Sequence, residues 1–207
     1  MALAGKGGPL TEKQQYYINR GYISTDRLIK LVNDMLNVSR IEAGRLSVVM
    51  APVNLVTVVN DVIAEVQPRA QELGIHLVYT PSPTPLPNVS ADADKIKQVL
   101  INLIGNSLKF TPKDGNITLS TYLQDNMVIT SVADTGSGIA KEDFPKLFHK
   151  FGKLDDKEYL VKQNAQGTGL GLYITKSRIE IHHGKIWFTS GGEGKGATFF
   201  FSLPPVL

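Results

Sequence analysis

The apolar positions of this chain change their spacing near residue 45. Before that point they recur at the three- and four-residue intervals that mark one face of a helix. Thr11 and Gln14 have the spacing of a capping box, and Gly44 stands where a helix would end in the left-handed conformation. We therefore predict one long helix over residues 11–44, with a length that suggests packing in a helical hairpin or bundle.

After residue 45 the chain alternates between strand-like and helix-like segments. The predicted strands cover residues 46–50, 75–80, 116–124, 127–133, 185–190 and 197–203. The predicted helices cover residues 54–73, 92–109 and 170–182. Strands and helices that segregate in this way favour a mixed sheet with helices on one face. The predicted fold class is α+β, a two-layer α/β sandwich preceded by one long helix.

The connections between these segments also have recognisable patterns. Asp125 and Asn126 predict a tight hairpin turn, and the proline-rich residues 81–87 predict an extended loop. The predicted organisation has three parts: a flexible or vector-derived start over residues 1–10, a helix over 11–44 and an α/β domain over 45–207.

Composition excludes several classes of function. The formal net charge of +3 is modest and dispersed, which argues against a nucleic-acid or membrane-surface partner. There is no cysteine, so disulfides, thiol nucleophiles and cysteine-based zinc sites are excluded. No apolar run approaches the ~20 residues of a membrane span, and no signal peptide is visible. We therefore expect a cytoplasmic domain.

The predicted helix 92–109 has polar residues on the face opposite its apolar residues. Asn102, Asn106 and Lys109 follow one another at spacings of four and three, so they share one face. An amide oxygen suits a magnesium ion bound to nucleotide phosphates, and a lysine suits the phosphates themselves. For this helix alone, a solvated polar face is the favoured alternative.

A carboxylate follows the predicted strand 127–133. Asp134 can accept a hydrogen bond from the exocyclic amine of adenine, while Gly136 and Gly138 let a purine approach the backbone. The alternative is a common turn of the Asp-x-Gly type.

A glycine-rich segment, residues 167–172, leads into the predicted helix 170–182. Its backbone N–H groups and the positive end of the helix can meet a phosphate. The segment lacks the lysine of a P-loop and does not follow a strand, which argues against a P-loop or a Rossmann site.

Three phenylalanines lie between the carboxylate and this segment. They either hold a mobile lid over residues 139–166 at its hinge or belong to a local core, and the two readings are about equal. They are Phe144, Phe148 and Phe151.

Taken together, these segments resemble the N, G1, F and G2 boxes of bacterial sensor histidine kinases, in the same order. Residues 194–199 resemble their G3 box, and residues 40–44 resemble the end of their second dimerisation helix. The resemblance covers roughly residues 9–205. It implies the Bergerat ATP-binding fold shared with gyrase, MutL and the Hsp90-type chaperones.

The resemblance implies roles for individual residues, with ATP or ADP and Mg²⁺ as cofactors. Asn106 would ligate Mg²⁺, Asp134 would bind adenine, and Asn102 and Lys109 would be the catalytic residues. The implied nucleotide-binding residues are Asn106, Lys109, Asp134, Gly136, Gly138, Lys153, Gly167, Thr168, Gly169, Leu170, Gly171 and Thr198.

These kinases phosphorylate a histidine on a first dimerisation helix, and none of the four histidines precedes residue 45. His76, His149, His182 and His183 are therefore not assigned as phosphoacceptors. His182 and His183 fall at a predicted helix end, where the helix dipole favours cations. We expect the chain to be the second dimerisation helix and the catalytic domain of a longer kinase.

The resemblance also implies partners. They are the receiver domain of a response regulator and a second copy bound through residues 12–43. Without the first helix, we expect this dimer to be concentration-dependent or non-native. No nucleic acid and no membrane contact are expected for this chain.

Two classes of function stay open at this point. The favoured one is transfer of the ATP γ-phosphate to a histidine that is supplied by the missing first helix or by another chain. The alternative is an ATPase, or a nucleotide-binding regulatory module without kinase activity, of the same superfamily. Asn102 favours transfer, because related ATPases usually have a glutamate four residues before the metal-binding asparagine and an amide cannot act as a general base.

Overall fold

A computed structural model describes residues 8–152 and 168–206. The chain divides between Arg45 and Leu46 into two compact units. Lys153 and Gly167, both expected to bind nucleotide, lie outside the described residues, as does half of the expected lid.

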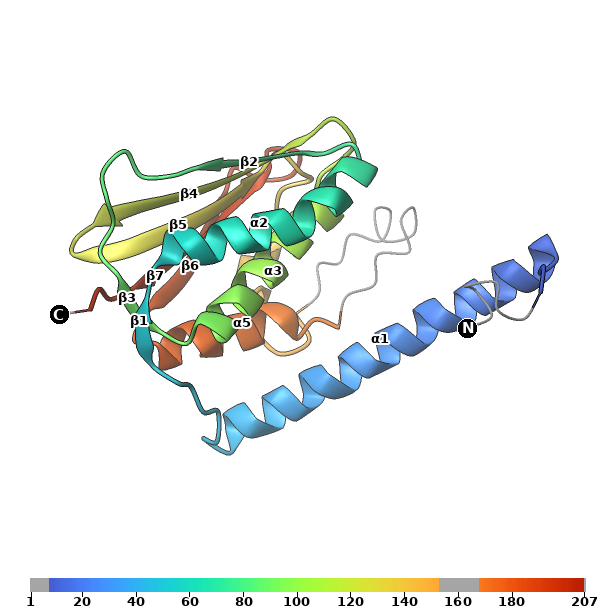
Figure 1. The fold of residues 1–207 in the computed structure, drawn as a ribbon, viewed down its shortest axis with the longest axis horizontal. Coiled ribbons are helices and arrows are strands. Elements are labelled where there is room, and N and C mark those ends of the chain that lie inside the picture. Colours follow the sequence, from blue (N-terminus) through green and yellow to red (C-terminus); the bar gives the residue numbers. More distant parts are fainter. Residues whose placement is uncertain (1–7, 153–167, 207) are drawn as a thin grey trace. The chain divides into compact units, whose positions relative to one another are not determined.

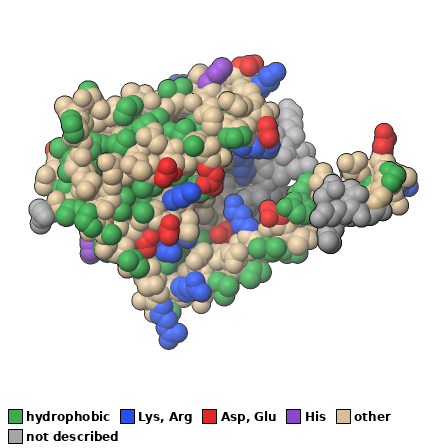
Figure 2. All heavy atoms as spheres, in the orientation of Figure 1, with side chains coloured by type: hydrophobic (Ala, Val, Ile, Leu, Met, Phe, Trp, Pro, Cys, Tyr) green, Lys and Arg blue, Asp and Glu red, His purple; other side chains and the backbone are tan. Residues whose placement is uncertain are grey.

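The first unit contains helix α1, Glu12–Glu42, and confirms the predicted long helix (Figure 1). The Thr11 side chain accepts a hydrogen bond from the Gln14 N–H, and Gln14 accepts one from the Thr11 N–H, so the capping box is present. Gly44 has the left-handed φ of +61° at the other end. No residue of α1 is buried, and Figure 2 shows hydrophobic side chains on its surface.

The second unit is built on a five-stranded sheet in the order β2-β4-β5-β7-β6. The strands are β2 (His76–Thr80), β4 (Asn116–Gln124), β5 (Met127–Asp134), β6 (Lys185–Ser190) and β7 (Ala197–Leu203). β2 pairs with β4 in parallel and the remaining pairs are antiparallel, so the mixed sheet is confirmed. Asp125 and Asn126 both have positive φ in the β4–β5 turn, as a tight hairpin of primed type requires.

Three helices cover one face of this sheet (Figure 1). They are α2 (Leu55–Glu72), α3 (Ala93–Phe110) and α5 (Gly171–Ile181). Asn54 caps α2 and Asp92 caps α3, each accepting a hydrogen bond from a backbone N–H three residues later. The apolar side of α3 supplies Leu100, Leu103 and Ile104, all without exposed surface, so the two-layer α/β sandwich is confirmed. Among the helices that the structure describes, none has the length and apolar character needed to cross a bilayer.

The predicted strand over residues 46–50 is wrong. Residues 45–50 have no regular secondary structure, and the Val49 N–H donates to the Asp92 carboxylate instead of to a neighbouring strand. The strand begins later, as β1 (Ala51–Val53), and it pairs with β3 (Val89–Ala91), which the hydrophobic pattern did not reveal. Strands of three residues are too short to establish an alternating pattern.

Candidate functional site

Helix α3 is joined to the first turns of α5 through Asn102. Its Nδ2 donates to the Thr175 hydroxyl at 2.9 Å, and Thr175 is only 1% exposed. A Cβ at Gly171 would lie 2.6 Å from Oδ1 of Asn102, so a side chain at this position would require the Asn102 amide to move. The structure therefore brings together Asn102 and Gly171, two of the predicted site residues, and gives the Asn102 amide a structural partner.

Asp134, at the end of β5, connects α3 and β7. Oδ1 accepts hydrogen bonds from the Gly136 N–H at 3.0 Å and the Ala197 N–H at 3.3 Å. Oδ2 accepts a hydrogen bond from the Ser107 hydroxyl at 3.1 Å. Three elements thus fix the orientation of this carboxylate.

Two of these partners, Ser107 and Ala197, were not predicted. Ala197 acts through its backbone N–H, which side-chain motifs do not reveal. Ser107 did carry a signal, because it is a polar residue on the otherwise apolar, buried side of α3. A polar group in such a position needs a hydrogen-bond partner.

The environment of Asp134 also changes its acidity. Burial raises the pKa of this carboxyl above its usual range, and the hydrogen bonds from Gly136, Ser107 and Ala197 act in the opposite direction. The carboxylate therefore takes up a proton at a higher pH than an exposed aspartate does.

The glycines that follow Asp134 are placed by close contacts. A Cβ at Gly136 would lie 2.6 Å from the carbonyl oxygen of Phe110, at the end of α3. Gly138 has a φ of +69°, which residues with a Cβ rarely adopt. The glycine pair thus forms a tight turn next to the carboxylate, an arrangement that fits both the nucleotide site and the ordinary Asp-x-Gly turn.

The described end of the glycine-rich segment forms the entry into α5. Gly169 is left-handed, with a φ of +72°, and the Thr168 hydroxyl accepts a hydrogen bond from the Leu170 N–H at 3.3 Å. Leu170 has no exposed surface. Leu170 therefore belongs to the core, and its backbone N–H is already donated to Thr168.

Asn106 and Lys109 lie on the same side of α3 as Asn102. Within the described parts of the chain, no group hydrogen bonds to the partly exposed Asn106 side chain. The Lys109 Nζ lies 4.6 Å from the centre of the Phe110 ring. No three His, Cys, Asp or Glu side chains among the described residues lie together as a metal site would require.

Thr198 does not lie with the other predicted nucleotide-binding residues, so its assignment as one of them is corrected. Thr198 pairs with Ala133 and Thr189 across the sheet, while its neighbour Phe199 packs against Phe148 and Phe188 under the helices. Successive side chains of a strand point to opposite faces. Thr198 therefore lies on the face of the sheet away from the helices.

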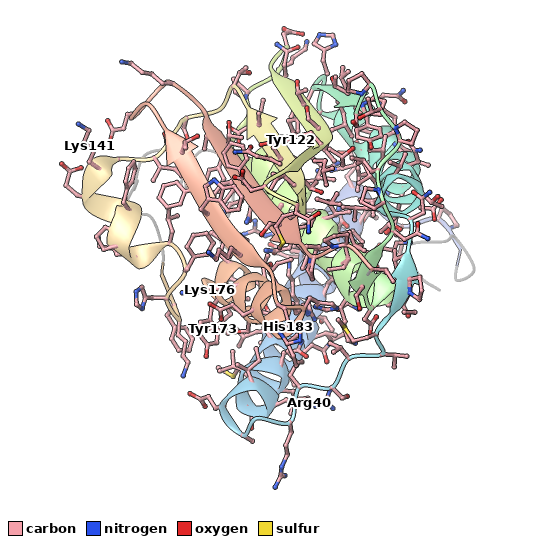
Figure 3. The ribbon with its side chains drawn as sticks, turned by 90° about the vertical axis from the view of Figure 1, so that its left-hand side faces the viewer. Arg40, Tyr122, Lys141, Tyr173, Lys176 and His183 are labelled. Carbon is pink, nitrogen blue, oxygen red and sulfur yellow. The ribbon has the colours of Figure 1, made fainter. Side chains whose placement is uncertain are left out.

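The phenylalanine-rich segment, residues 144–151, packs on the sheet just before residue 152, where the first described part of the unit ends. It begins within the short 3₁₀ helix η2, Lys141–Lys146, marked by Lys141 in Figure 3. Phe144 lies 4.9 Å from Phe188, centre to centre, and Phe148 lies 6.0 Å from it. Local core packing thus accounts for two of the three phenylalanines, whereas Phe151 is 57% exposed.

The far end of this segment also contacts α5. The Lys150 Nζ lies 5.4 Å from the centre of the ring of Tyr173, which is labelled on α5 in Figure 3. The expected lid beyond Gly152 falls outside the described residues.

His182 is not a cation at a helix end, contrary to our expectation. It is fully buried, and its Nε2 accepts a hydrogen bond from the Asp92 N–H at 3.0 Å, so this nitrogen carries no proton. Its Nδ1 lies 2.6 Å from the Arg178 carbonyl oxygen and donates to it. The ring is therefore neutral. Its Nδ1 hydrogen bond stays within α5, whereas its Nε2 holds the end of α5 to the start of α3.

Comparison with known proteins places this arrangement in a family. Residues 91–207 match the model for histidine kinase-, DNA gyrase B- and HSP90-like ATPases. The non-motile and phage-resistance protein of Caulobacter vibrioides is 37% identical over 204 residues, 95% of this chain and 23% of that protein. The circadian input-output histidine kinase CikA of Synechococcus elongatus is 35% identical over 198 residues, 95% of this chain and 26% of that protein. The chain thus spans about a quarter of the length of these relatives.

Solved structures agree. Full-length ShkA in complex with AMPPNP matches with a TM-score of 0.80 and 33% identity, over 97% of this chain and 41% of ShkA. The catalytic domain of the histidine kinase ThkA matches with a TM-score of 0.62 and 28% identity, over 76% of this chain and 96% of that domain. The chain belongs to the family of histidine kinase-, DNA gyrase B- and HSP90-like ATPases, and its α/β unit is a catalytic domain of the bacterial sensor histidine kinase type.

Proposed function

We propose that this chain binds ATP with Mg²⁺ and transfers the γ-phosphoryl group to a histidine on another segment or another chain. The observation that carries the proposal is the Asp134 carboxylate, held by two backbone N–H groups and one hydroxyl with acceptor capacity left over. An exocyclic amine of adenine is a donor of the required kind. The complex of the similar ShkA with AMPPNP supports the nucleotide class.

Asn106 fits the requirement for a magnesium ligand. Its amide is partly exposed and has no partner among the described residues, and a neutral oxygen adds no repulsion against phosphate. Mg²⁺ usually takes one or two protein oxygens and fills its other positions with phosphate oxygens and water. The ion would neutralise phosphate charge, and Asn106 would hold it while Lys109 balances the charge of the phosphates.

The residues favour phosphoryl transfer over hydrolysis. Phosphoryl transfer is catalysed mainly by positioning and charge stabilisation, whereas hydrolysis needs a group that activates water. The Asn102 amide has no usable basicity, and its N–H is already donated to Thr175. An ATPase would need a base other than Asn102, whereas a regulatory module without kinase activity needs none.

The histidines of the chain support an acceptor located elsewhere. His182 is fully buried and uses both ring nitrogens. His183 is exposed beyond the end of α5, and His149 lies in the phenylalanine-rich segment. We therefore expect no autophosphorylation of this chain by itself.

Two partners follow from the proposal. Helix α1 exposes Leu28, Val32 and Leu36 at helical spacing, which suits pairing with a second copy through residues 12–43. The structure of ThkA in complex with the response regulator protein TrrA, which matches this chain with a TM-score of 0.72 at 26% identity, supports a receiver domain as the other partner.

Calorimetric titration with ADP, with and without Mg²⁺, tests the binding site. Asp134→Asn should weaken ADP binding about 10- to 100-fold, because a charge-assisted hydrogen bond is lost. Asn106→Ala should remove only the Mg²⁺-dependent part of the affinity, and the exposed Asn88→Ala is the matched control. Unchanged affinity in Asp134→Asn would reject the adenine assignment.

Incubation with labelled ATP tests the acceptor. No acid-labile phosphate should appear on this chain, and phosphate should appear on an added dimerisation hairpin that carries a histidine. Stable phosphohistidine on His149 or His183 would contradict this part of the proposal.

A further inference from the structure

Ser107 is a buried polar residue that the proposed mechanism does not use. It is 2% exposed and shares the buried side of α3 with Leu103, Ile104 and Leu108. Burial of a hydroxyl without a hydrogen bond is unfavourable, so the partner of Ser107 shows what the residue does.

That partner lies on a different element. Serines inside helices often donate to a carbonyl four residues earlier in the same helix, as Ser177 does to the Tyr173 carbonyl. The Ser107 hydroxyl instead donates to Oδ2 of Asp134, 27 residues away on β5, at 3.1 Å. Ser107 therefore serves the carboxylate rather than its own helix.

The hydrogen bonds of Asp134 leave a defined acceptor position. A carboxylate oxygen accepts about two hydrogen bonds. Oδ1 receives the N–H groups of Gly136 and Ala197, whereas Oδ2 receives only the Ser107 hydroxyl. The remaining acceptor capacity is on the oxygen that Ser107 contacts.

The chemistry of that position distinguishes purines by the group at their sixth carbon. A 6-amino group donates a hydrogen bond to a carboxylate oxygen. A 6-oxo group would bring a second oxygen acceptor against it, which is repulsive. The discrimination depends on the rotamer of Asp134, and Ser107 is the one side chain among the described residues that hydrogen bonds to this carboxylate.

We propose that Ser107 is a positioning residue for base selection, which holds Asp134 so that the free acceptor of Oδ2 meets the 6-amino group of adenine. This inference rests on the proposed nucleotide site. It adds that selectivity for 6-aminopurines over 6-oxopurines is shared between Asp134 and a helix residue next to the expected metal ligand.

The test compares ADP with IDP, which has oxygen in place of the 6-amino group, by calorimetric titration of the full chain. Ser107→Ala should raise the Kd for ADP about 3- to 30-fold and leave the Kd for IDP nearly unchanged. Ser131→Ala is the matched control, because Ser131 is a 7%-exposed serine on the strand that carries Asp134. The control should keep the wild-type ratio of the two Kd values.

A double variant separates positioning from general destabilisation. In Asp134→Asn, adding Ser107→Ala should have little further effect on the ADP Kd if Ser107 acts through Asp134. Fully additive effects, or a wild-type ADP-to-IDP ratio in Ser107→Ala, would overturn the inference. Absence of ADP binding by the wild-type chain would instead reject the proposed function, so the two failures are distinguishable.

Discussion

Helices α1 and α3 both have apolar residues at helical spacing, but α3 buries part of them and α1 buries none. α3 has 18 residues and buries seven of them under the sheet, including Leu100 and Leu103. α1 has 31 residues and buries none. In α1, Leu28 is 61% exposed and Val32 is 53% exposed.

The difference shows what an apolar stripe can and cannot specify. A stripe at helical spacing predicts a helix, and helices in water depend mostly on packing of that stripe for their stability. The sheet that covers α3 belongs to the same chain. No residue of α1 is buried, which is the reason for proposing a second copy as its partner.

The largest effect should come from core truncation in the catalytic unit. Leu100→Ala removes a side chain with no exposed surface and should lower the free energy of unfolding by about 3–5 kcal/mol. Leu28→Ala in α1 should change the same transition by no more than about 0.5 kcal/mol. Urea denaturation followed by the fluorescence of Trp187, the one tryptophan of the chain, measures both. An equal loss in both variants would show that α1 is packed on the catalytic unit.

The pH dependence of ADP binding should reveal the partial burial of Asp134. Burial raises the pKa of this carboxyl, and a proton on Oδ2 would occupy the acceptor position proposed for the amine of adenine. The affinity should therefore be full above the raised pKa and should fall, by up to about tenfold per pH unit, as the pH decreases through it. Titration of ADP itself is common to wild type and Asp134→Asn, so their ratio isolates the effect. A pH-independent ratio would contradict the role of the carboxylate.

A smaller effect is expected for the contact between α3 and α5. Thr175→Val keeps the shape of a side chain that is 1% exposed, but it leaves the Asn102 N–H without its partner. We expect a loss of about 1–2 kcal/mol in the free energy of unfolding. The exposed Thr189→Val on β6 is the control. No loss in Thr175→Val beyond the control would mean that water replaces the hydroxyl.

The smallest effect should be a gain in α1. A Cβ at Gly21 meets no atom within 4 Å, so Gly21→Ala should stabilise the helix by about 1 kcal/mol without changing the Kd for ADP. Thermal melting by far-UV circular dichroism measures the gain.

Gly171→Ala is the opposite case, because its Cβ would lie 2.6 Å from Oδ1 of Asn102, and it should weaken ADP binding.

Regular elements with long periodic patterns were predictable from the sequence. The helices covering the sheet, its five strands and the Asp125–Asn126 turn were all identified. Strands β1 and β3 were not, because three residues cannot display a period and their pairing joins segments far apart in the chain. The hydrophobic run 46–50 was misassigned because its N–H at Val49 is satisfied by a side chain.

The candidate site was predictable at the level of motifs and less so at the level of side-chain direction. Asn102 lies against Gly171, and Asp134 is bonded to Gly136 and to Ser107, so two parts of the predicted site are tied to helix α3. The prediction for Thr198 was wrong because side chains alternate along β7, which places Thr198 on the face of the sheet away from the helices. The expectation of a cation at His182 was wrong because its ring accepts a hydrogen bond from the Asp92 N–H, 90 positions earlier. No local pattern in the sequence reveals such a contact.

The hydrogen bonds at Asp92 have a consequence for where the catalytic unit begins. The Asp92 carboxylate accepts hydrogen bonds from the N–H groups of Val49 and Lys95, and the Asp92 N–H donates to Nε2 of His182. The amide of Val49, although its residue is 77% exposed, should therefore exchange with deuterium more slowly than its neighbours. A fragment that starts at Ala51 would retain every strand and helix of the unit but would lose the hydrogen bond between the Val49 N–H and the Asp92 carboxylate. The functional boundary for fusions and chimaeras thus lies before residue 49, ahead of the first strand.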